Sequence, residues 1–215
     1  MDVIFSSAAS PAPDALLAGE MPRVTTPITL LSGENRVRGS VLGAVTVGAG
    51  AGVAAAGNTG NGTISAITTG ANAKSGVYQV VAIEPAANLG RFTVEDPDGI
   101  TIGTVNVGVA FAGAIGFTIT DGAVDFVAGD AFIVTVVAGS GKYKLSAAAA
   151  TDGSQRPIGI LVNTTDASLA DGKASLYRTG EFNEAALTFG AGHSVATVRA
   201  ALEALQIYLR TVVAA

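Results

Sequence analysis

Short runs of Val, Ile, Thr and Phe alternate with Gly-rich or Asp-Gly turns between residues 41 and 138. Runs of this length and composition, interrupted by turn residues, are typical of β-strands. The turns have a physical basis, because Asp accepts hydrogen bonds from the following backbone and Gly adopts positive φ, as in Asp96-Pro97-Asp98-Gly99 and Asp121-Gly122. The pattern predicts strands at 41–47, 63–68, 78–83, 91–95, 101–111, 117–120 and 131–137, with a Gly/Ala-rich turn at 48–57.

Beyond Gly139 the pattern changes, and a helix becomes recognisable. Ser194 is a residue type that favours the N-cap, and the apolar residues after it recur at helical spacing. Those residues are Val195, Val198, Leu202 and Leu205. Strands are predicted around the helix, at 142–146, 157–162, 174–178 and 206–213. The expected fold class is therefore mainly β with one helix, including a sandwich or meander of five or six strands over 58–138.

The first 27 residues contain four of the seven prolines, Pro11, Pro13, Pro22 and Pro27. Proline removes a backbone donor and fixes φ, so this segment is disfavoured as a helix or a central strand. Spaced apolar residues lie between the prolines, which predicts an extended N-terminal arm over 1–40 that adds as a strand to a neighbouring molecule. The alternative is a disordered terminus, which would usually be richer in charge.

Composition narrows the function classes. Of the 215 residues, 49% are hydrophobic and only 13% are charged, against about 25% charged in a typical domain. A surface with so little charge favours association, so an oligomer or larger assembly is expected. Without cysteine and with His193 as the single histidine, the chain cannot form disulfides, a Cys/His zinc site or a cysteine nucleophile.

Charge is distributed unevenly. Residues 41–141 hold seven acidic and two basic residues, which accounts for the whole net charge of −5, while the rest of the chain is balanced. We interpret this as a β domain of 58–138 inserted into a smaller domain made of 41–57 and 139–215. The acidic balance argues against nucleic acid as a partner. The uncharged stretches are too rich in Gly and polar residues to span a membrane, and the N-terminus lacks the basic region of a signal peptide.

No motif predicts catalysis. Residues 139–143 contain a Gly-Lys pair, but they lack the remaining residues of a phosphate-binding loop. His193 has no identifiable serine partner on a sharp turn, and it is interpreted as a polar residue before the helix. Asp121, Asp125 and Asp130 leave open a cation site in the inserted domain, although acidic turns need no metal. A structural or binding role without cofactor or metal is therefore favoured over an enzyme.

Several segments together resemble the bacteriophage lambda head decoration protein D family. The resemblance covers about residues 16–46 and 141–213, and the β-rich segment between them looks like a domain that longer members carry. The segments are TDGSQRPIGIL at 151–161, YRTGEFNE at 177–184, RGSVLG at 38–43, the closing helix and QIYL at 206–209.

The resemblance implies a small barrel, or tulip-like, core that sits as a homotrimer on the outer surface of an expanded phage head. It implies that the protein is made in the host cytoplasm, binds the major capsid protein and stabilises the shell against internal DNA pressure. The arm residues expected at the shell are Leu16, Leu17, Met21, Val24, Ile28, Leu30, Arg36 and Arg38. Trimer contacts are expected at Arg156, Pro157, Ile158 and Phe182, although placement in the core is favoured for Pro157, Ile158 and Phe182.

A second interpretation is a virion-surface adhesin whose inserted domain binds a glycan or a protein. Such a module would need an exposed apolar patch or a polar groove with stacking aromatic rings. The candidate rings are Tyr78, Phe92, Phe111 and Phe117, although their alternation favours the core. A third class, a virion enzyme, would need a pocket that brings acidic residues together.

Overall fold

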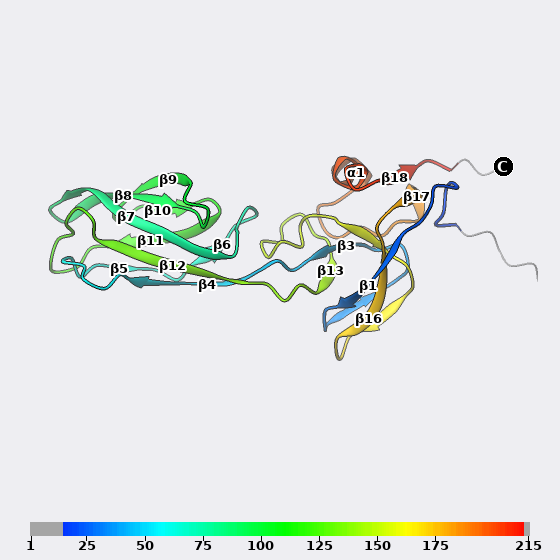
Figure 1. Cartoon of the computed structure of the whole chain (residues 1–215), viewed down its shortest axis with the longest axis horizontal. Coiled ribbons are helices and arrows are strands. Elements are labelled where there is room, and N and C mark those ends of the chain that lie inside the picture. The colour runs from blue at the N-terminus through cyan, green and yellow to red at the C-terminus, as the bar shows by residue number, and fades with distance from the viewer. Residues whose placement is uncertain (1–14, 213–215) are drawn as a thin grey trace, which may run out of the picture.

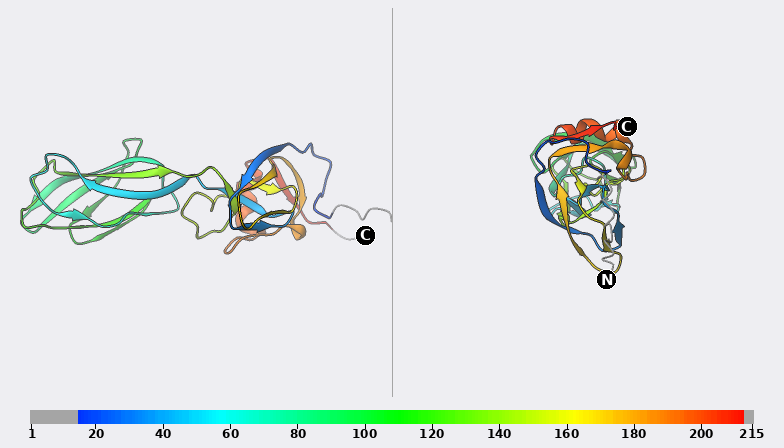
Figure 2. Two further views of the ribbon diagram at one scale, coloured as in Figure 1. Left: turned by 90° about the horizontal axis from the view of Figure 1, so that it is seen from below. Right: turned by 90° about the vertical axis from the view of Figure 1, so that its right-hand side faces the viewer.

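The chain folds into two lobes that lie end to end in an elongated molecule (Figures 1 and 2). The structure is a computed structural model that describes residues 15–212. We call residues 15–46 and 139–212 the barrel lobe, and residues 47–138 the sandwich lobe. The chain is mainly β, with a single α-helix among the described residues, as the sequence pattern predicts. No helix in this part of the chain has the length and apolar character needed to cross a membrane.

Five strands close the barrel, in the order β1, β13, β3, β14, β16. Strand β1 pairs with β16 along its full length, from Thr25 opposite Tyr177 to Leu30 opposite Gly172. Inward-facing apolar side chains fill the interior, and Leu30 is fully buried there. The strands are β1 (Thr25–Leu30), β3 (Val41–Ala44), β13 (Tyr143–Leu145), β14 (Gly159–Leu161) and β16 (Gly172–Tyr177).

Strand β1 corrects the expectation that the proline-rich segment stays outside the fold. Pro27 lies within β1, opposite Ser175 of β16. On its other side β1 meets β13 only at its last residue, Leu30 opposite Tyr143. Pro27 therefore has a strand neighbour on one side only, and a strand position of this kind tolerates the missing N–H.

One end of the barrel is covered by a small sheet and the helix. Strand β17 (Gly180–Asn183) pairs in parallel with β18 (Ile207–Arg210), and a 3₁₀ turn (Glu184–Ala186) and α1 (Val195–Glu203) connect them. Ser194 is the N-cap, as predicted, and its N–H donates to Thr197 Oγ1 at 2.8 Å. The buried face of α1 packs on Phe182 through Val198 and Leu202. Beside the barrel, β2 (Glu34–Arg36) pairs with β15 (Thr165–Ala167).

The sandwich lobe consists of two packed sheets, as the sequence pattern predicts. The larger sheet has the order β4 (Val47–Ala54), β12 (Ala131–Ala138), β7 (Gly76–Ala86), β8 (Leu89–Glu95), β9 (Thr101–Asn106). The smaller sheet joins β10 (Ala110–Ala112), β11 (Ile115–Thr120) and β5 (Thr63–Ile64), and β6 (Thr68–Thr69) also pairs with β11. Phe92, Phe126 and Phe132 meet between the sheets, with ring centroids 5.0–6.0 Å apart.

The start of the sandwich lobe differs from the predicted boundary at residue 58. The Gly/Ala-rich segment expected to be a turn at 48–57 is largely strand β4, which pairs with β12. Its inward positions need small residues, because a Cβ at Gly50 would lie 2.6 Å from Ile67 and one at Gly52 would lie 2.8 Å from Ile64. Gly here permits close packing of the sheets, a role that composition alone does not distinguish from a turn.

The two lobes are joined by a strand ladder that continues from one to the other. The β3–β13 pair of the barrel leads directly into the β4–β12 pair, through Val45 N–H to Lys142 O and Gly139 N–H to Thr46 O, both at 2.9 Å. A Cβ at Gly139 would overlap the Val45 carbonyl, so this close crossing requires glycine. The sandwich lobe is therefore inserted between the two paired barrel strands β3 and β13.

A second contact fixes the orientation of the lobes. Gln155 Nε2 donates to Ala71 O at 2.6 Å, and Arg156 Nη2 donates to Asn72 Oδ1 at 3.3 Å. These bonds join the barrel loop after β13 to the loop between β6 and β7. Two separate attachments resist bending at the ladder.

Asp130 holds together the loops at the far end of the sandwich lobe. Its buried carboxylate accepts from the N–H groups of Thr59 at 2.9 Å, Gly60 at 2.8 Å and Val127 at 3.0 Å. Burial alone would raise the pKa of this carboxyl, but the three backbone donors lower its pKa overall below the ordinary 3.8. A lowered folded-state pKa stabilises the fold above pH 3.8, and this contribution is lost as the pH falls through the folded-state value.

We expect Asp130→Ala to lower the free energy of unfolding of the sandwich lobe by about 2–4 kcal/mol, because one buried and two partly buried N–H groups lose a charged acceptor. It should also reduce the loss of stability in acid. Urea denaturation at neutral and acidic pH would measure both effects. The matched control is Asp125→Ala, since Asp125 is an exposed carboxylate with one backbone bond, from Asn88 N–H at 2.7 Å. Equal effects of the two variants would contradict this role of Asp130.

We also expect the barrel lobe to fold without the sandwich lobe. Replacing residues 47–138 by Asn-Gly would join Thr46 to Gly139, which already face each other across the ladder, through a two-residue hairpin turn. The shortened chain should show a β-type circular dichroism spectrum and one cooperative urea transition. If the shortened chain has no cooperative transition, the barrel lobe requires the sandwich lobe in order to fold.

Candidate interaction surface

The end of the barrel lobe opposite the sandwich lobe is where the described chain begins and ends (Figure 1). We call this end the terminal face. It comprises residues 15–24, strands β17 and β18, and the residues that follow β18 up to 212.

The N-terminal segment lies along β17 as an added strand. Ala18 N–H donates to Glu181 O at 3.1 Å, and Asn183 N–H donates to Leu16 O at 2.9 Å. Leu17 and Phe182 form an antiparallel bridge between these bonds. Residues 16–18, β17 and β18 thus make a three-stranded arrangement over the covered end of the barrel.

The connection from this segment to β1 is held by Thr179. Its hydroxyl donates to Pro22 O at 2.9 Å and accepts from Val24 N–H at 3.0 Å. Val24 O in turn accepts from Arg178 N–H at 2.8 Å. No motif in the sequence indicates this role of Thr179, because a single hydroxyl beside a turn glycine is common.

Most residues expected to contact a shell lie within the chain's own fold. Leu16, Ile28 and Leu30 are buried in the two clusters of the barrel lobe, so they cannot be buried against another protein. Leu17 and Met21 are half-buried. The expectation of strand addition is met inside one molecule, since the arm pairs with its own β17 and β16 instead of a neighbour's sheet.

The two arginines of the predicted arm also have intramolecular partners. Arg36 Nε forms an ion pair with Glu34, and Arg38 Nε donates to Val162 O at 3.1 Å. Among the described residues of the predicted set, Val24 is the one that is largely exposed, with 54% of its surface accessible. Residues 1–14 of the predicted arm lie outside the described residues.

The residues expected at a trimer contact are also largely internal. Phe182 is fully buried, with its ring centroid 5.0 Å from that of Tyr177, so its placement in the core is the correct alternative. Pro157 is buried and Ile158 half-buried. Arg156 is exposed, but it contacts the sandwich lobe through Asn72.

The acidic and basic side chains of the terminal face are equal in number, Glu20 and Glu181 against Arg23 and Arg210. Arg210 donates to Glu181 Oε1 at 2.7 and 3.0 Å, and Arg199 donates to Glu184 Oε2 at 2.6 Å. Hydrogen bonds from the Thr211 hydroxyl and then from Arg199 hold the pKa of Glu184 below its ordinary value. The pairing compensates these charges, and the exposed apolar side chains of Val24 and Val212 lie on the same face.

The single histidine, His193, is surrounded by side-chain and backbone groups of the barrel lobe. His193 Nε2 lies 3.2 Å from Ser146 Oγ and 3.1 Å from Gln155 O, and Thr197 Oγ1 lies 3.4 Å from Nδ1. Ser146 is buried, so a substrate could not reach its hydroxyl. These contacts join the segment before α1 to the loop that touches the sandwich lobe.

The acidic residues of the sandwich lobe do not converge on a cation site. Asp130 is bonded to three backbone N–H groups and Asp125 to one, while Asp121 Oδ1 is buried without a partner. Among residues 15–212, no three His, Cys, Asp or Glu side chains group in a way that could hold a metal ion.

Comparisons with known proteins place the chain in a family. A search of curated proteins found no match. Two crystal structures of Xanthomonas campestris FlgL, in space groups H3 and C2, are 22% identical, with TM-scores of 0.33 and 0.32 over 48% and 49% of this chain. The chain spans about a third (33%) of their length. The family model of the bacteriophage lambda head decoration protein D matches residues 7–208, which include both lobes.

That match covers most of the chain, in agreement with the mainly β fold built on a small closed barrel. The chain therefore belongs to the bacteriophage lambda head decoration protein D family, whose members are proteins of the phage capsid.

Proposed function

We propose that this protein sits as a homotrimer on the outer surface of the expanded phage head, where it binds the major capsid protein and stabilises the shell against the pressure of packaged DNA. The terminal face contacts the shell, and the sandwich lobe points into the solvent. The observation that carries this proposal is the end-to-end arrangement, in which the sandwich lobe and the two ends of the described chain lie at opposite extremes (Figures 1 and 2).

Charge supports the same orientation. The sandwich lobe holds seven acidic and two basic residues, whereas the terminal face has equal numbers of acidic and basic residues, two of which form the Arg210–Glu181 ion pair. An acidic lobe is well solvated when it projects into water, and a face with compensated charges and exposed Val24 and Val212 loses less hydration when it is covered.

Residues 15–30 are already ordered in the folded chain, and this lowers the conformational-entropy cost of attachment to the shell. Fixing the backbone of one residue costs about 1–2 kcal/mol. These residues are already fixed on the chain's own β16 and β17, so their ordering does not oppose binding to the shell. In a trimer, contacts made after the first become intramolecular, and weak individual contacts then add to firm attachment.

A structural role without catalysis, cofactor or nucleic acid is part of the same proposal. The buried Ser146 and the half-buried His193 pack against the loop that orients the lobes, and this position favours a structural use of the single histidine.

Contacts between copies are proposed at the loop between β15 and β16 of the barrel lobe. Leu169, in this loop, is 95% exposed. The loop is held in place by Ser168 N–H to Asp166 Oδ1 at 2.9 Å and Ser32 N–H to Asp171 Oδ1 at 3.0 Å. Burying a leucine contributes about 1.5–3 kcal/mol, and a trimer would gain this three times.

Removing residues 1–14 should leave a folded trimer that no longer sediments with expanded heads. The deletion keeps every described residue and removes the segment that continues from the terminal face. Removing residues 213–215, which follow the same face, is the matched control and should preserve co-sedimentation. A deletion extended to residue 27 is unsuitable, because it removes Leu16 and half of β1. Heads that still bind the 1–14 deletion would show that this segment is not an attachment arm.

Leu169→Asp should convert trimers into monomers in sedimentation velocity at micromolar concentration, because each interface would have to desolvate a carboxylate. Val137→Asp is the control, since Val137 is similarly apolar and exposed but lies on the sandwich lobe. If the Leu169 variant keeps the mass of the unmodified protein, the contact between copies lies elsewhere.

A further inference from the structure

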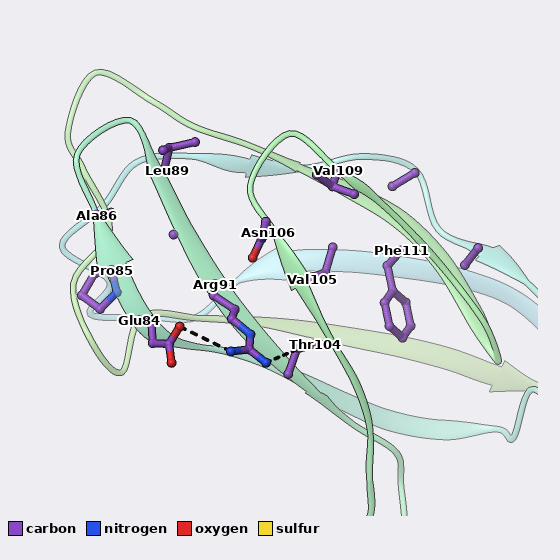
Figure 3. A pocket seen from close by; sticks show the side chains of 13 residues that line it. Glu84, Pro85, Ala86, Leu89, Arg91, Thr104, Val105, Asn106, Val109 and Phe111 are labelled. Carbon is purple, nitrogen blue, oxygen red and sulfur yellow. Dashed lines mark hydrogen bonds and ion pairs between the residues drawn. The ribbon is translucent and has the colours of Figure 1, made fainter.

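The sandwich lobe contains a groove whose side chains are suited to sugar hydroxyls. It has a volume of about 900 Å³ and lies across the outer surface of β8 and β9, reaching toward β10 (Figure 3). The groove is far from the terminal face, so attachment of the barrel lobe would leave it open to solvent (Figure 1). Its volume is within the range of about 300–1,000 Å³ for small-ligand sites.

Four polar side chains stand in this groove: Glu84, Arg91, Thr104 and Asn106 (Figure 3). The Arg91 guanidinium donates to Glu84 Oε2 at 3.4 Å and to Thr104 Oγ1 at 3.2 Å, which orients its plane over the sheet. A guanidinium has five N–H donors, so further donors remain for a ligand. The side-chain amide of Asn106 supplies two donors and one acceptor, and no hydrogen bond within residues 15–212 uses it.

An aromatic ring forms part of the groove wall. Phe111 is half-buried, and its ring lies against that of Phe117 at 5.2 Å with 30° between the planes. This packing fixes the ring, and Phe111 remains partly exposed at the groove. Leu89 and Val109, both exposed, add apolar surface at the groove. Of the four rings considered from the sequence, Tyr78, Phe92 and Phe117 are buried, and Phe111 is the one that reaches the groove.

A sugar ring combines an apolar C–H face with hydroxyls at its edge, each of which both donates and accepts. The groove offers the complement, with an aromatic ring, apolar side chains and planar groups that include donors and acceptors. We propose that this groove binds a neutral oligosaccharide, such as one exposed on a cell surface.

Charge and geometry favour a neutral saccharide over other ligands. Glu84 compensates the charge of Arg91, and the lobe as a whole is acidic, so an anionic ligand would be repelled. An extended peptide would pair with backbone groups at a sheet edge. Although β9 is the edge strand of the larger sheet, the polar groups that line the groove are exposed side chains of β7, β8 and β9, and a peptide that pairs with the backbone of β9 would not use them.

The test uses the purified full chain and isothermal titration with neutral hexasaccharides built on glucose, mannose, galactose or N-acetylglucosamine. At least one should bind saturably at millimolar concentration or below. Arg91→Ala and Asn106→Ala should each weaken that binding tenfold or more, about 1.4 kcal/mol. Gln79→Ala is the matched control, because Gln79 is exposed on the same sheet outside the groove. Unchanged thermal unfolding of all three variants would confirm that they fold.

Three outcomes would overturn the proposal: no hexasaccharide binds, binding is unchanged in both groove variants, or only a sulfated hexasaccharide or an unstructured decapeptide binds. The measurement needs no phage head. The saccharide-binding proposal is therefore tested independently of the proposal that the barrel lobe attaches to the shell.

Discussion

The pairing of β1 with β16 is the interaction on which the barrel lobe depends. It brings residues 25–30 against residues 172–177 and places Ile28 and Leu30 in the barrel interior. Without this strand, β16 would have a free edge and the apolar interior would open to water. The segment before β1 then follows β17, so the same pairing also determines where the terminal face forms.

The relative position of the lobes depends on local backbone pairing. Because the β3–β13 ladder leads into β4–β12, the direction of the sandwich lobe is set by the direction of two barrel strands. Gln155 and Arg156 add a lateral contact, and His193 supports their loop through Nε2, which lies 3.1 Å from the carbonyl oxygen of Gln155. The strand ladder and these few side-chain contacts therefore fix the position of the sandwich lobe relative to the barrel lobe.

Much of this architecture can be predicted from the sequence, and the exceptions have physical causes. The alternating pattern predicts most strands and the helix after Ser194. It does not distinguish β4 from a turn, because Gly and Ala serve equally in turns and in closely packed strands. It also does not show whose sheet an added strand joins, so it predicts contacts with a neighbouring molecule for Leu16 and Leu30, which instead complete their own lobe. The groove on β8 and β9 depends on which side chains face outward together, and the linear order of Arg91, Thr104 and Asn106 does not reveal it.

The hairpin that carries the sandwich lobe has its two strands side by side where they leave the barrel, as Gly139 N–H bonded to Thr46 O indicates. Any folded unit whose own ends lie a strand's width apart could be grafted at this place without disturbing the barrel interior. Proteins built on this barrel could thus exchange the lobe that this hairpin carries over evolution, or be engineered to display a chosen domain there. Each new unit would have to satisfy only its own folding and this one geometric requirement.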